Sequence, residues 1–587
     1  RVFHKTLAGL QSIDLLVRAV EAAKADPLEL DPNGFDGPAG LVQAARENSD
    51  LISNALGTAI IENRGLAPFL GRLSEHLIGE PLLLPDSPRL WLGHSGATSE
   101  FLNNVDSYLI RPAFEPTARP GHASPGQSLS GLDEAARAKV LADVELNAAR
   151  YVAEVPTGFA TAPSWSANGL VAKPYALRIF VAAAGDDYVV MPGGLALTVD
   201  AGAAVSLSAP QADSRDVWVV ADEPQGPHYS RWRISEEESQ VQRLGSRLPS
   251  RVADNLFWLG RYVERADWTM RVMRNALSRG DEDLRPIRRG EAAQSAIDII
   301  IAKGRPPVAA GTPPDDEDAG RTLEERVEEL FTSAGNPYGI LTTFQNIRRV
   351  ARQSRDRLSL DAWRLLGSLT IERKNGIARS SDPAVELVER LDRRISELAA
   401  FNGLMHENMT RNFGWRFMDI GRRIERAHQM AELLRRLLAV ASEEPDETDR
   451  LAFLLETADS FMTYRARYRF APAFPLVLDL LLVDETNPRG IAFQLVEIAD
   501  HIAELPKASL DAVRTPEQRL ALGLLTQVRL ADIDALRVVD DTGARPALMA
   551  ALDALITGLP RLSDVISRRY FSLTEEQPQR VHTRLAP

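Results

Sequence analysis

The sequence contains no cysteine in its 587 residues. This absence excludes disulfide bonds, thiolate metal sites and cysteine nucleophiles. The 9 histidines are scattered along the chain without a His-x-x-x-His pair, and no cysteine is present to complete a zinc site with them. We therefore expect no zinc-dependent chemistry.

The chain also lacks a long apolar run. No stretch approaches the roughly 20 residues needed to span a bilayer. The longest candidate, residues 474–483, carries Asp479 at its centre and is interpreted as a buried helix. The chain opens at Arg1 without a methionine or a signal-like apolar segment. We expect a cytoplasmic protein with no membrane partner, and a further portion of the protein before Arg1.

An excess of positive charge is missing as well, because the formal net charge is −13 at pH 7. Binding to nucleic acid needs clustered lysine and arginine to neutralise phosphates, so we expect no nucleic-acid partner. The arginines are interleaved with glutamate and aspartate, a pattern typical of solvated or salt-bridged helix surfaces. The length of the chain predicts several domains.

The first 220 residues mix helix and strand patterns, which indicates an α+β region. A helix is expected over residues 14–25. The dipeptide Gly185-Asp186 between two apolar runs predicts the tip of a hairpin. The runs predicted as strands are residues 89–92, 107–110, 177–181, 187–191 and 216–220.

Residues 221–247 have the polar, proline-containing composition of a linker. Beyond them strand patterns nearly vanish and helical periodicity continues, so residues 248–575 are predicted to form an all-helical bundle domain. The fold class expected from the sequence is therefore multidomain, with an α+β region followed by an all-α domain.

One helix pattern occurs twice in the helical region. Apolar residues step by 3, 4, 3, 4 and 3 positions from Leu256 to Met273, and they do so again from Phe417 to Leu434, an offset of 417 − 256 = 161 residues. Polar residues coincide at the same offset although they lie off the apolar stripe. These residues are Arg261, Glu264 and Arg265 in the first helix and Arg422, Glu425 and Arg426 in the second.

Two interpretations of the repeated arginines and glutamates are open. They form a structural network of salt bridges between two related helices, for which the arginine fork is well suited. Alternatively, the four repeated arginines line a pocket for an anion or a carboxylate, to which Arg465, Arg467, Arg469 and Arg489 could contribute. If the helices arose by duplication, they should pack as pseudo-symmetric mates with the repeated residues meeting.

Two features of the α+β region could belong to a site. Met191-Pro-Gly-Gly-Leu195 predicts a tight turn after a strand, which alone is weak support for a function. Arg178 stands within an apolar strand, so it points into a cleft or pairs with a carboxylate, or it is a buried arginine without a function. Arg111 places a further cation at a strand end.

Several segments together resemble a known pair of modules. Residues 1–10, Leu109-Ile-Arg-Pro-Ala-Phe114, Leu177-Arg-Ile-Phe180, Met191-Pro-Gly-Gly-Leu195 and residues 214–219 are similar to circularly permuted ATP-grasp proteins, a family related to glutathionylspermidine synthase. Residues 248–266, residues 355–363 and Asn487-Pro-Arg489 resemble the bacterial alpha-E helical domain. The resemblance covers nearly the whole chain, in the order that such fusions use.

This resemblance implies an ATP-dependent carboxylate–amine ligase that works through an acyl phosphate, with ATP and Mg²⁺ as cofactors. It implies that Arg178 faces the phosphates or the acyl group as a catalytic residue, and that Arg111, Glu154 and Lys173 lie at the nucleotide. The substrates would be an amine and the carboxylate of a peptide or amino acid. The family context also implies a partner with a transglutaminase-like fold.

The sequence departs from this family at two points. Leu197 stands where an arginine is expected shortly after the two glycines, and the acidic and asparagine metal ligands are expected before Arg1, so the metal ligands remain unknown. The alternative function is a non-catalytic ATP-grasp scaffold whose alpha-E module binds a peptide or a protein partner. The two departures favour the scaffold, whereas Arg178 and the Met191-Pro-Gly-Gly-Leu195 turn favour the ligase.

Overall fold

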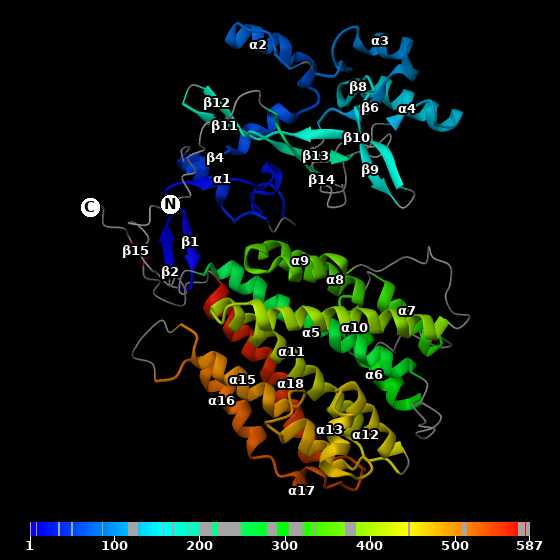
Figure 1. Ribbon diagram of the computed structural model, residues 1–587, viewed down its shortest axis with the longest axis vertical. Helices are drawn as coiled ribbons and strands as arrows, with labels where there is room; N and C mark the ends of the chain where they lie inside the picture. The colour runs from blue at the N-terminus through cyan, green and yellow to red at the C-terminus, as the bar shows by residue number, and fades with distance from the viewer. Residues whose placement is uncertain are drawn as a thin grey trace. The chain divides into compact units, whose positions relative to one another are not determined.

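The computed structural model describes residues 2–7, 9–32, 36–48, 51–84, 86–114, 127–156, 158–166, 169–185, 187–198, 214–220, 248–278, 290–304, 321–333, 336–369, 383–443, 446–506, 513–572 and 581–582 (Figure 1). The chain divides into two compact units. The N-terminal unit comprises Arg1–Val2 and Ile13–Gln240, and the helical unit comprises Phe3–Ser12 and Val241–Pro587. The predicted order, an α+β region and then an all-helical region, is confirmed. The predicted linker, residues 221–247, lies outside the described residues.

The N-terminal unit contains two antiparallel four-stranded sheets. In the first, the strands follow the order β5 (Arg89–Trp91), β8 (Tyr151–Glu154), β6 (Leu109–Pro112), β7 (Gln127–Ser128). In the second, the order is β14 (Ser214–Val217), β13 (Gly194–Thr198), β10 (Gly169–Arg178), β9 (Thr161–Ser166).

The predicted hairpin is present as β11 (Val181–Ala184) paired antiparallel with β12 (Asp187–Val190). Gly185 at its tip has φ 65°, the left-handed conformation that glycine adopts without a steric penalty. The helices of this unit are α1 (Leu41–Glu47), α2 (Leu70–Ile78), α3 (Ala97–Asn103) and α4 (Glu134–Leu146). A small core forms where α3 and α4 cover the first sheet, around Leu92, Phe101, Ile110, Leu129, Val144 and Ala153.

The helix expected over residues 14–25 is wrong. Leu16 and Val17 instead form β3 (Leu16–Val17), which pairs in parallel with β4 (Ile52–Ser53), and only a short 3-10 turn, η1 (Ala22–Lys24), follows. The guanidinium of Arg18 donates to the carbonyl of Asn54 at 2.7 Å. Tertiary pairing with a distant segment therefore outweighs a weak local helix preference.

The helical unit begins with a hairpin from the start of the chain, β1 (Phe3–Thr6) and β2 (Gly9–Ser12), beside which β15 (Val581–His582) runs parallel to β2. Its helices are α5 (Ser250–Leu277), α6 (Gly290–Gly304), α7 (Leu323–Thr332), α8 (Ile340–Gln353), α9 (Leu360–Ser368), α10 (Pro383–Asn408), α11 (Phe413–Leu438), α12 (Asp446–Thr457), α13 (Phe461–Tyr468), α14 (Phe474–Leu478), α15 (Ile491–Ala503), α16 (Pro516–Arg529), α17 (Ile533–Leu536) and α18 (Pro546–Ile566).

The two helices predicted from the repeat, α5 and α11, form the centre of this unit (Figure 1). They pack against each other, α5 is further covered by α8 and α10, and α11 is covered by α15 and α18. Every residue of both predicted stripes is buried, with at most 1% of its surface exposed. Burial on several sides explains why these helices are apolar over more than one face.

The apolar run at residues 474–483 is a buried helix, as predicted. It consists of α14 and a single π-helical turn, η11 (Asp479–Val483). Asp479 at its centre is half-buried, and its carboxylate accepts a hydrogen bond from the hydroxyl of Tyr468. None of the described helices has both the length and the apolar character that crossing a membrane would require.

Candidate functional site

The backbones of α5 and α11 approach each other at two glycines that the repeat aligns. A Cβ atom at Gly260 would lie 2.0 Å from the carbonyl oxygen of Met418, and one at Gly421 would lie 2.1 Å from that of Phe257. Phe257 and Met418 are also 161 residues apart, so the two contacts are equivalent. Only glycine permits this approach, and the reciprocity shows that the helices are pseudo-symmetric mates.

The repeated arginines and glutamates meet beside the glycines. Arg265 Nε donates to Glu425 Oε1 at 2.7 Å, and in the equivalent pair Arg426 Nε donates to Glu264 Oε1 at 2.6 Å. Arg426 Nη2 adds a second bond of 2.6 Å to Glu264 Oε2. Arg261 Nε donates to the remaining oxygen of Glu425 at 2.7 Å. The prediction that the repeated residues meet across the two helices is therefore confirmed for all of them except Arg422, which pairs with Asp419 on its own helix.

Both glutamates are buried and remain charged. Glu264 is 0% exposed and Glu425 is 3% exposed. Burial alone would raise the pKa of Glu425, but the charges and hydrogen bonds of Arg265 and Arg261 outweigh it and hold this pKa well below its usual range. The pKa of Glu264 is also lowered, because Arg426, Arg489 and Arg422 outweigh the effect of burial. The network thus holds two carboxylates ionised inside the helix bundle.

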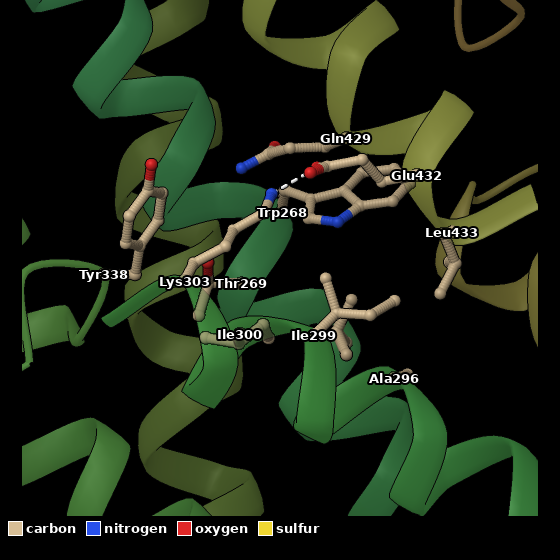
Figure 2. Close-up of a pocket in the computed structure, with 11 residues that line it drawn as sticks. Trp268, Thr269, Ala296, Ile299, Ile300, Lys303, Tyr338, Gln429, Glu432 and Leu433 are labelled. Atoms are coloured by element: carbon tan, nitrogen blue, oxygen red, sulfur yellow. Dashed lines mark hydrogen bonds and ion pairs between the residues drawn. The ribbon is translucent and has the colours of Figure 1, made fainter. Parts of the chain in front are cut away.

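Gln429, whose amide donates to Glu425 Oε1 at 3.4 Å, lines a small cavity beside the network (Figure 2). Its volume is about 20 Å³, enough for one water molecule. The ring of Tyr338 lies between two cations, with Arg265 at 4.6 Å and Lys303 at 5.5 Å from its centroid. Lys303 also forms an ion pair with Glu432, as Figure 2 shows. This cavity is too small for a substrate.

A second polar cluster involves residues that the sequence analysis did not select. His501 Nε2 lies 2.8 Å from Asp419 Oδ2, and Glu497 lies within reach of both. Arg423 forms ion pairs with Asp419 and, at 3.1 Å, with Glu497. Because Arg423 already occupies the carboxylate oxygens, we interpret the cluster as an arginine-clamped network rather than a metal centre.

A sequence signal existed for only part of that cluster. Asp419 precedes Arg422 and Arg423 by three and four positions, the spacing at which side chains pair on one helix. His501 lies 82 residues away from Asp419, and nothing local connects the two. Its role follows only from the packing of α15 on α11.

Of the additional arginines considered with the network, one joins it. Arg489 Nη1 lies 3.4 Å from Asp267 Oδ2 on α5. Arg467 pairs with Asp484 at the surface, and Arg465 and Arg469 are exposed. The structure therefore separates Arg489 from the other three candidates.

In the N-terminal unit, Arg111 and Glu154 lie on the paired strands β6 and β8, where Glu154 is opposite Leu109, two residues before Arg111. Arg111 Nε donates to Glu154 Oε2 at 2.8 Å, and Arg89 Nη2 lies 3.3 Å from the other oxygen. The side chains of Arg111 and Glu154 are only 11% and 16% exposed. Two of the residues that the family resemblance implied at the nucleotide are thus in direct contact.

Arg178 ends β10 and is exposed rather than buried. Its guanidinium lies 5.1 Å from the centroid of the Phe180 ring. The glycine turn supports this strand end, because a Cβ atom at Gly194 would lie 2.6 Å from the carbonyl oxygen of Arg178. Gly193 has φ 146°, which also favours glycine. The two glycines are therefore explained by backbone geometry.

Lys173 lies on β10, paired with Ala162 of β9, and is half-buried. Leu197 lies on β13, paired with Ala176 of β10, and is 7% exposed. Leu197 thus contributes to the interior at the position where the family resemblance led us to expect an arginine. The strand β10 carries both Lys173 and Arg178, whereas Arg111 and Glu154 belong to the other sheet.

Comparisons with known proteins match both parts of the chain. Residues 248–571 match the alpha-E family, described as a predicted alpha-helical domain with a conserved ER motif, and residues 1–198 match circularly permuted ATP-grasp type 2. Glu264-Arg265 and Glu425-Arg426 are Glu-Arg pairs within the first range, and they are the residues that exchange ion pairs between α5 and α11.

Similar proteins occur in several bacteria. An uncharacterised protein of Mycobacterium tuberculosis is 27% identical over 602 residues, which cover 98% of this chain and 64% of that protein. An uncharacterised protein of Mycobacterium leprae is 28% identical over 233 residues, covering 39% of each. One of Synechocystis is 23% identical over 217 residues, covering 37% of this chain and 44% of that protein. The chain spans about 64% of the length of the relatives that it matches over nearly all of its own length.

Proposed function

This chain belongs to the alpha-E family, with a circularly permuted ATP-grasp region before the alpha-E domain, and from this premise we propose that the protein is an ATP-dependent carboxylate–amine ligase. Its substrates would be the carboxylate of an amino acid or peptide and an amine. The family match suggests ATP-dependent ligation, and the cations of β6 and β10 support a site for a polyanionic nucleotide.

The proposed reaction has two steps. A carboxylate oxygen of the first substrate attacks the γ-phosphorus of ATP, which gives an acyl phosphate and releases ADP. The amine nitrogen then attacks the acyl carbon, phosphate leaves with the electrons of the C–O bond, and the nitrogen loses a proton as the amide forms. Both steps spread negative charge over phosphoryl oxygens, so fixed cations lower their barriers.

The observation that carries the proposal is the placement of Arg178. Strand pairing and the Gly193-Gly194 turn fix its backbone, while its guanidinium stays exposed and available to a phosphate. We propose that Arg178 contacts the phosphates or the acyl group and that Lys173, on the same strand, lies near it. Arg111 would contact the nucleotide, with Glu154 holding its guanidinium in position.

The described residues of the N-terminal unit contain no group of three acidic or histidine side chains with ligating atoms within 4.8 Å of one another. Among the residues that the structure describes, the group of three side chains with metal-ligating atoms within 4.8 Å of one another is Asp419, Glu497 and His501, which belongs to the helical unit. We therefore assign no magnesium ligand, and no step of the proposed reaction is assigned to a metal.

The alpha-E domain would serve as an accessory or substrate-binding module, and a protein with a transglutaminase-like fold would be a partner. A second candidate function is a non-catalytic scaffold that binds a peptide or a protein partner. The burial of Leu197 favours this second candidate, because an aliphatic side chain occupies the position where the ligase was expected to carry a cation.

Calorimetric titration with ATP and Mg²⁺ tests the proposal. We expect binding by the protein, and we expect Arg178→Ala to weaken it by at least roughly tenfold, which corresponds to about 1.4 kcal/mol. Arg215→Ala is a matched control on strand β14 of the same sheet, where the guanidinium is bonded to Pro163 and Ser164. Absence of binding would overturn the ligase and leave the scaffold. Binding that survives Arg178→Ala unchanged would remove the role of Arg178.

A further inference from the structure

The pseudo-symmetry of α5 and α11 is broken at one position. Arg261 donates to Glu425, so its counterpart Arg422 should donate to Glu264. Instead Arg426 takes both oxygens of Glu264, and Arg422 turns to Asp419 on its own helix. Asp419 also accepts from Arg423 and lies against His501. Arg422 therefore shares the carboxylate of Asp419 with Arg423 and His501.

This side of the network contains more buried cations than buried anions. Five guanidiniums gather there: Arg271, Arg422, Arg423, Arg426 and Arg489. Among the described residues, three buried carboxylates face them: Glu264, Asp267 and Asp419, each at most 2% exposed. Asp459 and Glu497 partly neutralise Arg271 and Arg423, but their side chains are 64% and 34% exposed.

Two of the five guanidiniums, those of Arg422 and Arg489, lack a full hydrogen-bond or charge partner. Arg422 Nε is buried and has no hydrogen-bond partner among the described residues. The nearest carboxylate contact of Arg489 is 3.4 Å to Asp267, which Arg271 already holds at 2.9 Å. Burial, and then the charges of neighbouring guanidiniums, lower the pKa of both Arg422 and Arg489. A buried donor or charge without a full partner is costly, so an added anion would be stabilising.

The site is also within reach of a ligand. The side chains of Arg422 and Arg489 are 18% and 20% exposed. Both lie close enough to Glu264 to act on its carboxylate, and Arg426 Nη1 donates to the carbonyl of Pro488, next to Arg489. These contacts connect α11 with the turn before α15.

We propose that Arg422, Arg426 and Arg489 form a binding site for an oxyanion group of a ligand, a carboxylate or a phosphate. The planar fork of arginine binds both groups through paired hydrogen bonds. In this assignment Glu264 positions Arg426, and Arg422 and Arg489 supply the free donors. The site belongs to the alpha-E domain alone, so it does not depend on the proposed ligase activity.

The test is calorimetric titration of the whole protein with inorganic phosphate and, separately, with succinate, at constant ionic strength in chloride. We expect one of the two to bind with a Kd of about 1 mM or tighter. Tighter binding of phosphate identifies a phosphate group as the ligand, and tighter binding of succinate identifies a carboxylate. Lack of binding by both at about 10 mM, ten times that Kd, overturns the proposal.

Variants locate the bound anion, because phosphate could also bind in the N-terminal unit. We expect Arg489→Gln and Arg422→Gln each to weaken binding by roughly tenfold. Arg435→Gln is the matched control, since Arg435 lies on α11 and pairs with the partly exposed Asp553 away from the site. The proposal is overturned if both site variants bind the anion as tightly as the unaltered protein does. It is also overturned if Arg435→Gln weakens binding as much as the site variants do.

Thermal denaturation separates binding from a structural role. The bound anion should raise the Tm of the unaltered protein and of Arg435→Gln, and it should raise the Tm of Arg489→Gln much less. If Arg422→Gln fails to fold, Arg489→Gln, which changes a turn rather than the central helix, decides alone. An Arg489→Gln variant with a lowered Tm and an unchanged anion effect would make Arg489 purely structural and contradict the site.

Discussion

The two units handle charge in opposite ways. In the helical unit, Glu264 and Glu425 are buried between α5 and α11, and arginines of the opposite helix neutralise them. In the N-terminal unit, the candidate catalytic Arg178 is exposed at the end of a strand, and every residue described in β11 and β12 is exposed. Most charges of the helical unit are therefore paired inside the bundle, with Arg422 and Arg489 as the exceptions, whereas Arg178 of the N-terminal unit is exposed to ligands.

This difference indicates where each unit is sensitive to change. A buried ion pair fails badly when one partner is removed, because the other charge stays buried without compensation. An exposed cation contributes little to stability, since solvent screens it. Substitutions within the paired network should therefore affect mainly stability, whereas substitutions of Arg178 or Arg489 should affect mainly ligand binding.

The largest effect is expected from removal of one network glutamate. Glu425→Gln leaves Arg261 and Arg265 without a charged partner and should lower the free energy of unfolding of the helical unit by about 3–5 kcal/mol. Glu29→Gln in the N-terminal unit is the comparison, because its ion pair with Arg46 lies at the surface, and we expect about 1 kcal/mol or less. Urea denaturation followed by circular dichroism measures both. Similar losses for the two variants would contradict the comparison.

The close approach of α5 and α11 gives the next largest effect. Gly260→Ala places a Cβ atom 2.0 Å from the carbonyl of Met418, so the helices must separate, at a cost of about 1–3 kcal/mol. Gly403→Ala on α10 is the matched control, because its Cβ atom would have no neighbour within 4 Å. That change should stabilise by about 0.5–1 kcal/mol through helix propensity. A tolerated alanine at 260 would refute the close helix contact.

Acid should weaken the helical unit through its buried carboxylates. The folded pKa values of Glu425 and Asp419 lie below the values of about 4.3 and 3.9 in an unfolded chain. Their stabilising contribution is thus fully present above about pH 4.3 and is lost as the pH falls toward the folded pKa values, by about 1.4 kcal/mol per pH unit for each proton taken up. Urea denaturation between about pH 5 and pH 2 measures this slope, and Glu425→Gln should reduce it. If the free energy of unfolding of the variant falls as steeply with pH as that of the unaltered protein, Glu425 does not cause the acid sensitivity.

The smallest effect on stability is expected at Arg178. Arg178→Ala removes an exposed side chain and should change the free energy of unfolding by no more than about 0.5 kcal/mol. The same variant is expected to lose affinity for ATP. Substitution of Arg178 should therefore impair binding without impairing stability, whereas substitution of Glu425 should impair stability. Thermal denaturation measures the stability. A loss above about 2 kcal/mol would place Arg178 among the structural residues instead.

The sequence predicted the helical unit better than the N-terminal one, for a physical reason. Burial forces the apolar stripes and the two glycines into register, so the offset of 161 residues is visible in the sequence. The repeated arginines and glutamates are off the stripe, and all of them except Arg422 have their partners across the helix pair. Short strands such as β3 depend on a distant pairing with β4, and residues 14–25 were therefore misassigned to a helix.

Parts of the sites could not be predicted. Asp419 stands at the position equivalent to Trp258 of α5, and its spacing to Arg422 permits a pair on one helix but does not show that this pair replaces a bond to Glu264. The ring of Trp258 lies 5.0 Å from the guanidinium of Arg261. The contact of Arg111 with Glu154 depends on the register of β6 and β8, which single-strand patterns do not specify.

A double-mutant cycle on Glu264 and Arg426 tests the central claim most directly, that the repeated Glu-Arg residues bind each other across α5 and α11. The single variants Glu264→Gln and Arg426→Gln and the double variant give a coupling energy, which we expect to be about 1.5–3 kcal/mol for this buried two-bond pair. The exposed pair Arg435–Asp553 should give about 1 kcal/mol or less in the same experiment. A coupling between Glu264 and Arg426 below about 0.5 kcal/mol would contradict the account.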